Sequence, residues 1–364
     1  MSKFAFLVHQ TSNSPFDTWL KLARTKWYFG LVPPHVLHYA MLPRIPLNFD
    51  RFLRYEATGI ASGAFGTEGI FRALPYSTDY MRRARPADKV VEASRLCLAE
   101  GVGVIGLGAY NSIVTDGGTI VANALRSSGV AVTSGNSLTA WAAIEGLNNL
   151  CVQLNIPLQD QTVAVIGPGG TTGSAICNLL KGRTERLLLL GGGRTDLHPL
   201  AEHLGENVEI CEGLDDVISR SQVIVSATNS PGALRINPTT TLPWKVFVDV
   251  ARPRDVGKIV SRLPHVIAID GGIFRVPGEN VELGLDFGLP RGFAFACMAE
   301  TMVLAMLDHT ESHVGDLDPA YVHWIGEQAC ALGFRVDALR SQDRVVTEEK
   351  VTAMRELIAK RGVR

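Results

Sequence analysis

Short runs of apolar residues, many of them β-branched, alternate along most of the chain with apolar positions at helical spacing. Runs of roughly four to eight apolar residues bounded by turns are typical of buried parallel strands, and apolar positions three and four apart predict helices. The pattern predicts an α/β fold with two lobes and a central Rossmann-type, doubly wound parallel sheet. The expected strands are residues 4–8, 102–107, 130–132, 163–166, 187–190, 208–211, 223–226, 246–250 and 266–269.

The same pattern divides the chain into three consecutive parts. We expect an N-terminal α/β domain at residues 1–154, a nucleotide-binding Rossmann domain at 155–294 and a C-terminal helical segment at 295–364. Thr133-Ser-Gly-Asn-Ser137 has the composition of a helix cap, and the helix that it opens should run to about Leu154. The C-terminal helices are expected at about residues 295–309, 318–333 and 347–361.

The stretch from Gln161 to Thr195 has the pattern of a strand, a glycine-rich turn, a helix and a second strand. Such a unit holds a dinucleotide pyrophosphate, because glycines allow a tight turn and close backbone approach and the helix N-terminus attracts the anion. A glycine-rich turn without a ligand is the alternative. The residues expected at the cofactor are Gly167, Gly169, Gly170, Thr171, Thr172 and Gly173.

The end of the second strand indicates which nicotinamide cofactor is expected. An NAD site usually has an acidic residue there, whereas an NADP site has an arginine nearby for the 2′-phosphate. Here Arg194 and Thr195 precede the first acidic residue, Asp196. We therefore expect NADPH, with a solvated loop arginine as the alternative.

Ligands of such sheets bind beyond the carboxyl ends of the strands. Thr228 and Asn229 are therefore expected at the nicotinamide ribose, and Asp249 is expected in the cofactor site. Asp249 and Asp270 would serve equally well as loop caps that accept hydrogen bonds from backbone N–H groups.

Composition excludes several classes of protein. The chain has 364 residues, 46% hydrophobic and 20% charged, which is typical of a globular protein of about two domains. A net charge of -1 gives no basis for a nucleic acid or an anionic membrane as a partner. No apolar run has the length of a membrane span, and the N-terminus lacks the apolar core of a signal peptide. Six scattered cysteines favour reduced thiols and a cytoplasmic location.

Two groups in the C-terminal part could carry chemistry. Cys297 is expected in or just before the first turn of a helix, which favours the nucleophilic thiolate, and a buried core cysteine is the alternative. His309 and His313 lie one helical turn apart, a spacing typical of metal ligands. Acidic residues such as Glu311 are close, but no third ligand is evident, so we expect a solvated helix end and predict no metal site.

Five blocks of sequence together resemble a known family. They are Val8–Ser12, Leu107–Ile113, Thr133–Ala140, Gly167–Gly173 and Phe295–Met302. In this order they are similar to blocks of the long-chain acyl-[acyl-carrier-protein] reductases of cyanobacteria, which make fatty aldehydes. The likeness spans roughly residues 4–335.

The resemblance implies that Cys297 is a nucleophile that takes an acyl group from an acyl carrier protein or acyl-CoA, and that NADPH then reduces it to an aldehyde. It further implies an aldehyde-consuming enzyme as a partner. Ser112 and Asn136 are the hydrogen-bond donors expected beside the reacting oxygen. The family's Asp-Gly-Gly-Tyr segment is Asp270-Gly-Gly-Ile273 here, so the resemblance does not fix the acyl group.

Two other functions stay open. A shikimate-dehydrogenase-like oxidoreductase for a small hydroxy acid or ketone shares the two-lobed plan. Such an enzyme needs a lysine near the strand ends of the first lobe, and Lys89 is the only lysine between Met41 and Asp160. A nucleotide-binding sensor would keep the fold without catalysing a reaction.

Overall fold

A computed structural model describes residues 2–10, 30–37, 41, 54–193, 195–228, 234–252, 254–336, 339–342 and 344–361. The chain forms two compact units. The N-terminal unit comprises Met1–Gly135, Val276–Asp316 and Gln328–Phe334, and the Rossmann unit comprises Asn136–Arg275, Leu317–Glu327 and Arg335–Arg364. The division at residues 154 and 294 that the sequence suggests stays a prediction.

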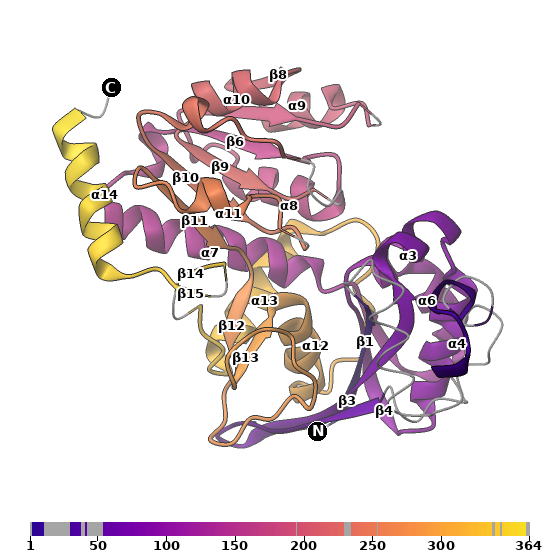
Figure 1. Ribbon diagram of the computed structural model, residues 1–364. Coiled ribbons are helices and arrows are strands. Elements are labelled where there is room, and N and C mark those ends of the chain that lie inside the picture. The colour runs from indigo at the N-terminus through magenta and orange to yellow at the C-terminus, as the bar shows by residue number, and fades with distance from the viewer. Residues whose placement is uncertain are drawn as a thin grey trace. The chain divides into compact units, whose positions relative to one another are not determined.

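The Rossmann unit contains a parallel sheet of six strands in the order β11-β10-β9-β6-β7-β8 (Figure 1). This order reverses direction between β6 and β9, as in a dinucleotide-binding doubly wound sheet, so the predicted fold class is confirmed. The strands are β6 (Thr162–Ile166), β7 (Arg186–Leu190), β8 (Val208–Cys211), β9 (Val223–Ser226), β10 (Lys245–Asp249) and β11 (Val266–Asp270).

Helices cover both faces of this sheet because alternate residues of each strand point to opposite sides. Val163 and Val165 of β6 pack with α7, α8 and α14, whereas Ala164 and Ile166 pack with α10 and α11. The helices of this unit are α7 (Asn136–Leu154), α8 (Thr171–Leu180), α9 (His198–Leu204), α10 (Leu214–Arg220), α11 (Lys258–Ser261) and α14 (Glu348–Arg361).

The N-terminal unit contains a five-stranded sheet in the order β2-β3-β1-β4-β5. β1, β3, β4 and β5 are parallel, and β2 pairs antiparallel with β3 at the edge. The sequence pattern does not predict β2, because few of its residues are buried and its apolar alternation is weak. The strands are β1 (Lys3–Gln10), β2 (Arg54–Ser62), β3 (Phe65–Ser77), β4 (Val102–Leu107) and β5 (Ala131–Thr133).

Different helices pack on the two faces of this sheet. α4 (Ala87–Leu98) and α6 (Thr119–Leu125) form a core with residues such as Leu7 and Ile105. The other face packs against α12 (Ala296–Met306), which contacts β1, β3 and β4 (Figure 1). Contact between α12 and β4 is close, because a Cβ on Gly106 would lie 2.0 Å from Oγ1 of Thr301.

The remaining elements are short, apart from α13. They are α2 (Pro34–Val36), α3 (Thr78–Ala84), α5 (Tyr110–Val114), η6 (Arg126–Ser128), η7 (Leu158–Asp160), η8 (Pro238–Thr241), β12 (Ile273–Arg275), β13 (Phe293–Phe295), α13 (Pro319–Ala331), β14 (Arg340–Ser341) and β15 (Arg344–Val345). Among the described residues, no helix combines the length and the hydropathy that crossing a bilayer requires. The sequence pattern also predicts an aromatic-rich helix after Pro15, a stretch that lies outside the described residues.

Candidate functional site

The glycine-rich turn follows β6, next to the point where the strand order reverses. Gly167 has φ of +87°, a conformation that L side chains rarely adopt. A Cβ at this residue would lie 2.8 Å from the carbonyl oxygen of Ala227, which follows β9. The turn therefore requires glycine at this position, and its backbone lies at the crevice where such sheets bind ligands.

The other glycines of the turn have different roles. A Cβ on Gly173 would lie 2.1 Å from the carbonyl oxygen of Gly167, so glycine allows α8 to pack against the turn. Gly170 is the N-cap of α8, and a Cβ there would meet only the Gly167 oxygen, at 3.7 Å. Open space beside the first N–H groups of a helix fits a pyrophosphate, so these residues can hold a dinucleotide.

The structure places most of the other predicted cofactor residues near this turn. Thr171 and Thr172 are the first two residues of α8. A Cβ on Gly169 would lie 2.9 Å from Cβ of Thr195, so the segment after β7 lies against the turn. Arg194 and Asn229 lie outside the described residues.

Asp255 holds the segment that follows β9, a role that the sequence analysis did not identify. Its carboxylate accepts hydrogen bonds from the Ser226 hydroxyl at 2.5 Å and from the Thr228 hydroxyl at 2.8 Å. Burial raises the pKa of Asp255. Thr228 is thus fixed beside the crevice, and its contact with the ribose stays a prediction. Lone aspartates are common in loops, so no local signal distinguishes this one.

The carboxylates of Asp249 and Asp270 interact with other groups of the protein, through hydrogen bonds and an ion pair respectively. Asp249 is buried at the end of β10, where its carboxylate accepts hydrogen bonds from the N–H groups of Ala251 and Val256. Burial raises the pKa of Asp249 to about 6. Asp270 pairs with Arg254, at 2.5 Å. For Asp249 the geometry is that of a loop cap, one of the two roles expected from the sequence, and its contact with the cofactor stays a prediction.

Cys297 is the second residue of α12, as the sequence pattern predicts, and its side chain is half-buried. The loop after β5 lies directly against it. Gly135 has φ of +70°, and a Cβ there would lie 2.4 Å from Cβ of Cys297. The block Thr133–Ala140 and the block Phe295–Met302, far apart in the sequence, therefore meet at this point.

A buried hydrogen-bonded chain supports the loop. The Thr133 hydroxyl donates to the Glu300 carboxylate at 2.6 Å and accepts from the Gly135 N–H at 2.9 Å. Thr133 and Glu300 are both fully buried. Because Glu300 lies one turn after Cys297 on α12, this chain fixes Gly135 against the start of the helix. Glu300 lies in the resemblance block Phe295–Met302, but no local pattern in the sequence indicates its hydrogen bond with Thr133.

The other five cysteines have different surroundings. Burial raises the pKa of Cys97 to about 11 and the pKa values of Cys151 and Cys177 to about 12. Burial also raises the pKa of Cys211. Cys330 is half-buried, but it lies in the last turn of α13, where the helix dipole disfavours an anion. Cys297 thus combines partial exposure with the helix end that favours a thiolate.

The two expected hydrogen-bond donors lie in different units. Ser112 is buried in α5 of the N-terminal unit, and Asn136 is the first residue of α7 in the Rossmann unit, directly after Gly135. Two resemblance blocks also meet in the N-terminal unit, because Nε2 of His9 accepts a hydrogen bond from the Tyr110 N–H at 3.3 Å. The roles of Ser112 and Asn136 stay predictions.

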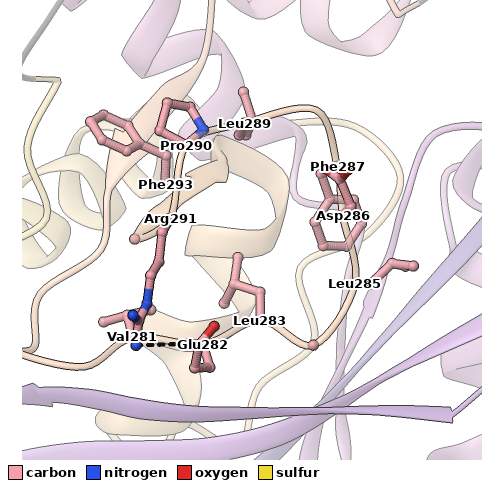
Figure 2. A pocket seen from close by; sticks show the side chains of 12 residues that line it. Val281, Glu282, Leu283, Leu285, Asp286, Phe287, Leu289, Pro290, Arg291 and Phe293 are labelled. Carbon is pink, nitrogen blue, oxygen red and sulfur yellow. Dashed lines mark ion pairs between the residues drawn. The ribbon is translucent and has the colours of Figure 1, made fainter.

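A pocket of about 360 Å³ lies in the N-terminal unit, in the loop before β13 (Figure 2). Its lining includes Leu283, Phe287 and Phe293 and an exposed ion pair between Arg291 and Glu282 at 2.6 Å. Cys297 does not line this pocket, and its lining contains no nucleophilic thiol. The pocket is therefore not the candidate reactive site.

Comparison with known proteins gives a family match for part of the chain and a relative that matches most of it. Residues 151–270 match the family model for shikimate / quinate 5-dehydrogenase. The chain is 32% identical over 320 residues to aminotransferase PigE of a Serratia strain, a match that covers 84% of this chain and 36% of that protein. The chain thus spans about a third of the length of that relative.

A second relative matches over most of both chains. Long-chain acyl-[acyl-carrier-protein] reductase of Synechococcus elongatus is 25% identical over 307 residues, covering 81% of this chain and 88% of that protein. Among solved structures, quinate dehydrogenase from Corynebacterium glutamicum in complex with NAD aligns with a TM-score of 0.41 and 14% identity, over 91% of this chain and 99% of that one. The sequence matches support an NAD(P)-dependent oxidoreductase.

Proposed function

We propose that this protein is an NADPH-dependent reductase that converts an acyl thioester into an aldehyde through an acyl group carried on Cys297. The observation that carries the proposal is the position of Cys297, half-buried in the first turn of α12 and in contact with Gly135. The relative from Synechococcus elongatus, an acyl-[acyl-carrier-protein] reductase by name, supports the substrate class.

In the first step, the Cys297 sulfur attacks the carbonyl carbon of the thioester. The bond to the carrier sulfur breaks, the carrier leaves as a thiolate that takes a proton from solvent, and the acyl group stays on Cys297 as a new thioester. N–H groups in the first turn of α12 stabilise the thiolate before attack. We propose Ser112 and Asn136 as hydrogen-bond donors to the carbonyl oxygen as it gains negative charge.

In the second step, the acyl carbon is reduced and the Cys297 thiolate is released together with the aldehyde. NADPH, when bound, supplies the hydride for this step. Gly167, Gly170 and the first turn of α8 would hold its pyrophosphate, and Arg194 with Thr195 would bind the 2′-phosphate. The protein would receive its substrate from acyl carrier protein or coenzyme A in the cytoplasm and pass the aldehyde to a further enzyme.

A shikimate-dehydrogenase-like activity is the second candidate, since that family model matches residues 151–270. The match covers the nucleotide-binding sheet and ends before Cys297, so it concerns the cofactor more than the substrate. Lys89, the one lysine that this mechanism could use between residues 41 and 160, pairs with Glu92 on α4 at 2.7 Å. Its place on a helix and not at a strand end counts against Lys89 as the proton donor of this second activity.

Intact-protein mass spectrometry after incubation with acyl-CoA tests the proposal and separates it from the alternatives. We expect the mass of one acyl group to be added without NADPH and to disappear when NADPH is supplied, with release of aldehyde. A dehydrogenase for a small hydroxy acid or a nucleotide sensor would form no adduct. A stable adduct that NADPH does not discharge would contradict the reductase.

A further inference from the structure

His309, Glu311 and His313 form a cluster just after α12 that the proposed reaction does not use. The Nε2 atoms of the two histidines are 2.8 Å apart, and the rings stack with centroids separated by 5.0 Å. One ligand atom from each of the three residues lies within 4.8 Å of the others. The structure thus brings the Glu311 carboxylate close to the histidine pair, a position that the sequence pattern does not reveal.

Backbone hydrogen bonds fix the two histidines to different elements. The His309 N–H donates to the carbonyl of Leu304 at 2.9 Å, at the end of α12. The His313 N–H donates to the carbonyl of Val132 at 2.8 Å, and its carbonyl accepts from the Ser134 N–H at 3.1 Å. His313 thereby extends the sheet beside β5. The backbone of both histidines is thus fixed before any ligand arrives, which lowers the cost of binding.

Two imidazole nitrogens and one carboxylate oxygen form a ligand set suited to zinc and similar transition-metal ions. Calcium and magnesium prefer oxygen ligands, of which this cluster offers too few. We propose that His309, Glu311 and His313 bind one divalent transition-metal ion of the zinc class, with the fourth position left to solvent. In tetrahedral zinc sites two nitrogens lie roughly 3.3 Å apart, so side-chain rotation must separate the Nε2 atoms by about 0.5 Å.

A metal at this position would join the end of α12 to β5, the strand whose following loop lies against Cys297. His309 follows α12, which begins beside Cys297, and His313 is bonded to Val132 and to Ser134, which precedes Gly135. The ion would therefore support the contact between Gly135 and Cys297 from a distance. The site itself stands independently of the proposed reaction, because its ligands are not part of the reductase machinery.

The test is a zinc titration of the full chain in competition with a chromophoric chelator. The Cys297→Ser variant serves as the background, so that the nucleophilic thiol cannot capture the ion and loss of acyl transfer does not affect the result. We expect one zinc ion per chain. His309→Gln and His313→Gln should each lower the zinc affinity at least about 100-fold. Loss of a group that only orients a metal ligand already lowers affinity about 10- to 100-fold, and loss of a ligand itself should cost at least as much. Glu311→Gln, at an exposed residue, should lower the zinc affinity about tenfold.

His198→Gln is the matched control, because His198 is an exposed histidine 2.8 Å from the Asp196 carboxylate and lies outside the cluster. Its zinc affinity should not change. Cobalt in place of zinc should give the visible absorption of a four-coordinate nitrogen and oxygen site. Unchanged zinc affinity in both cluster histidine variants, or a cobalt spectrum with thiolate charge-transfer bands, would overturn the proposal. Thermal unfolding curves identify any variant that fails to fold.

Discussion

The turn after β6, at the carboxyl edge of the sheet in the Rossmann unit, is built from glycines, whereas at the corresponding edge in the N-terminal unit buried polar side chains hold a loop against a reactive cysteine. At the first edge, Gly167 and Gly170 expose backbone next to β9 and α8. At the second, Gly135 makes room for Cys297 while Thr133 and Glu300 hold the loop. The first arrangement can hold an anionic cofactor, and the second can hold a nucleophile.

The two sites differ in how far apart their residues lie along the chain. A backbone cradle needs only consecutive residues, because turn, glycine and helix follow one another along the chain. A side-chain site needs partners from distant segments, such as Thr133 and Glu300, which are 167 residues apart. If the turn binds the cofactor and the loop supports the nucleophile, a substitution at one of them should leave the function of the other intact.

Replacing the nucleophile should have the largest effect. Cys297→Ser should lower aldehyde formation at least about a thousandfold, because removal of a covalent nucleophile removes the whole route. NADPH binding, measured by fluorescence titration, should be unchanged. Cys330→Ser is the control, since Cys330 is the other half-buried cysteine and lies at a helix C-terminus. Equal activity of the two variants would remove Cys297 from the mechanism.

Arg194→Ala tests whether the cofactor that binds at the glycine turn after β6 is NADPH or NADH. We expect KM for NADPH to rise roughly 10- to 100-fold and KM for NADH to change little, because a hydrogen bond to a charged group contributes about 1.5–3 kcal/mol. Arg186→Ala, at the first residue of β7, is the control and should change neither. A parallel rise for both cofactors would contradict a 2′-phosphate contact. Steady-state kinetics with each cofactor gives the answer.

Gly170→Ala separates cofactor binding from acyl transfer. The backbone accepts alanine, since φ is -89° and the nearest atom to the new Cβ is 3.7 Å away. A methyl group at this position would meet the pyrophosphate, so we expect NADPH affinity to fall about tenfold with no loss of acyl-adduct formation. Gly213→Ala, at the N-cap of α10, provides a matched control with unchanged affinity. Normal NADPH affinity in Gly170→Ala would place the cofactor elsewhere.

Thr133→Val tests whether the hydrogen bonds of Thr133 with Glu300 and Gly135 position Cys297. The variant keeps the shape but removes the hydroxyl, leaving the Gly135 N–H and the Glu300 carboxylate without that partner. We expect a loss of about 1–3 kcal/mol in the free energy of unfolding and roughly tenfold slower acyl-adduct formation. Thr133→Ser should restore most of both quantities. Urea denaturation and adduct kinetics measure them, and an unaffected adduct rate in Thr133→Val would show that the chain does not position Cys297.

Lys245→Met should raise the free energy of unfolding and leave both cofactor binding and acyl transfer unchanged. Lys245 is almost fully buried at the start of β10, where burial lowers its pKa from 10.5 to about 8. The unfolded chain binds more protons between these pH values, so the unmodified protein should become more stable as pH rises from about 8 to about 10.5. Removing the buried charge should add about 1–3 kcal/mol at pH 7 and abolish this dependence. Chemical unfolding at several pH values measures the free energy of unfolding and its dependence on pH. A variant less stable than the unmodified protein would contradict the prediction, because it would show that the buried ammonium group stabilises the fold.

Elements that depend only on neighbouring residues can be predicted from the order of the residues alone. The nine expected strands, the glycine turn after β6, the start of α7 at Asn136 and the position of Cys297 in the first turn of α12 are all present. Each follows from periodicity, from the conformational freedom of glycine or from helix-capping chemistry. Those forces act over a few residues, so the order of the residues is enough to reveal them.

Tertiary structure decided the contacts between distant segments. The pairing of β2 with β3, the hold of Asp255 on Thr228, the contact of Gly135 with Cys297 and the meeting of Glu311 with two histidines all depend on how the chain packs. A buried carboxylate or a glycine in a close contact looks the same in the sequence as one in solvent. Only the packed fold brings its partner within hydrogen-bonding or van der Waals distance.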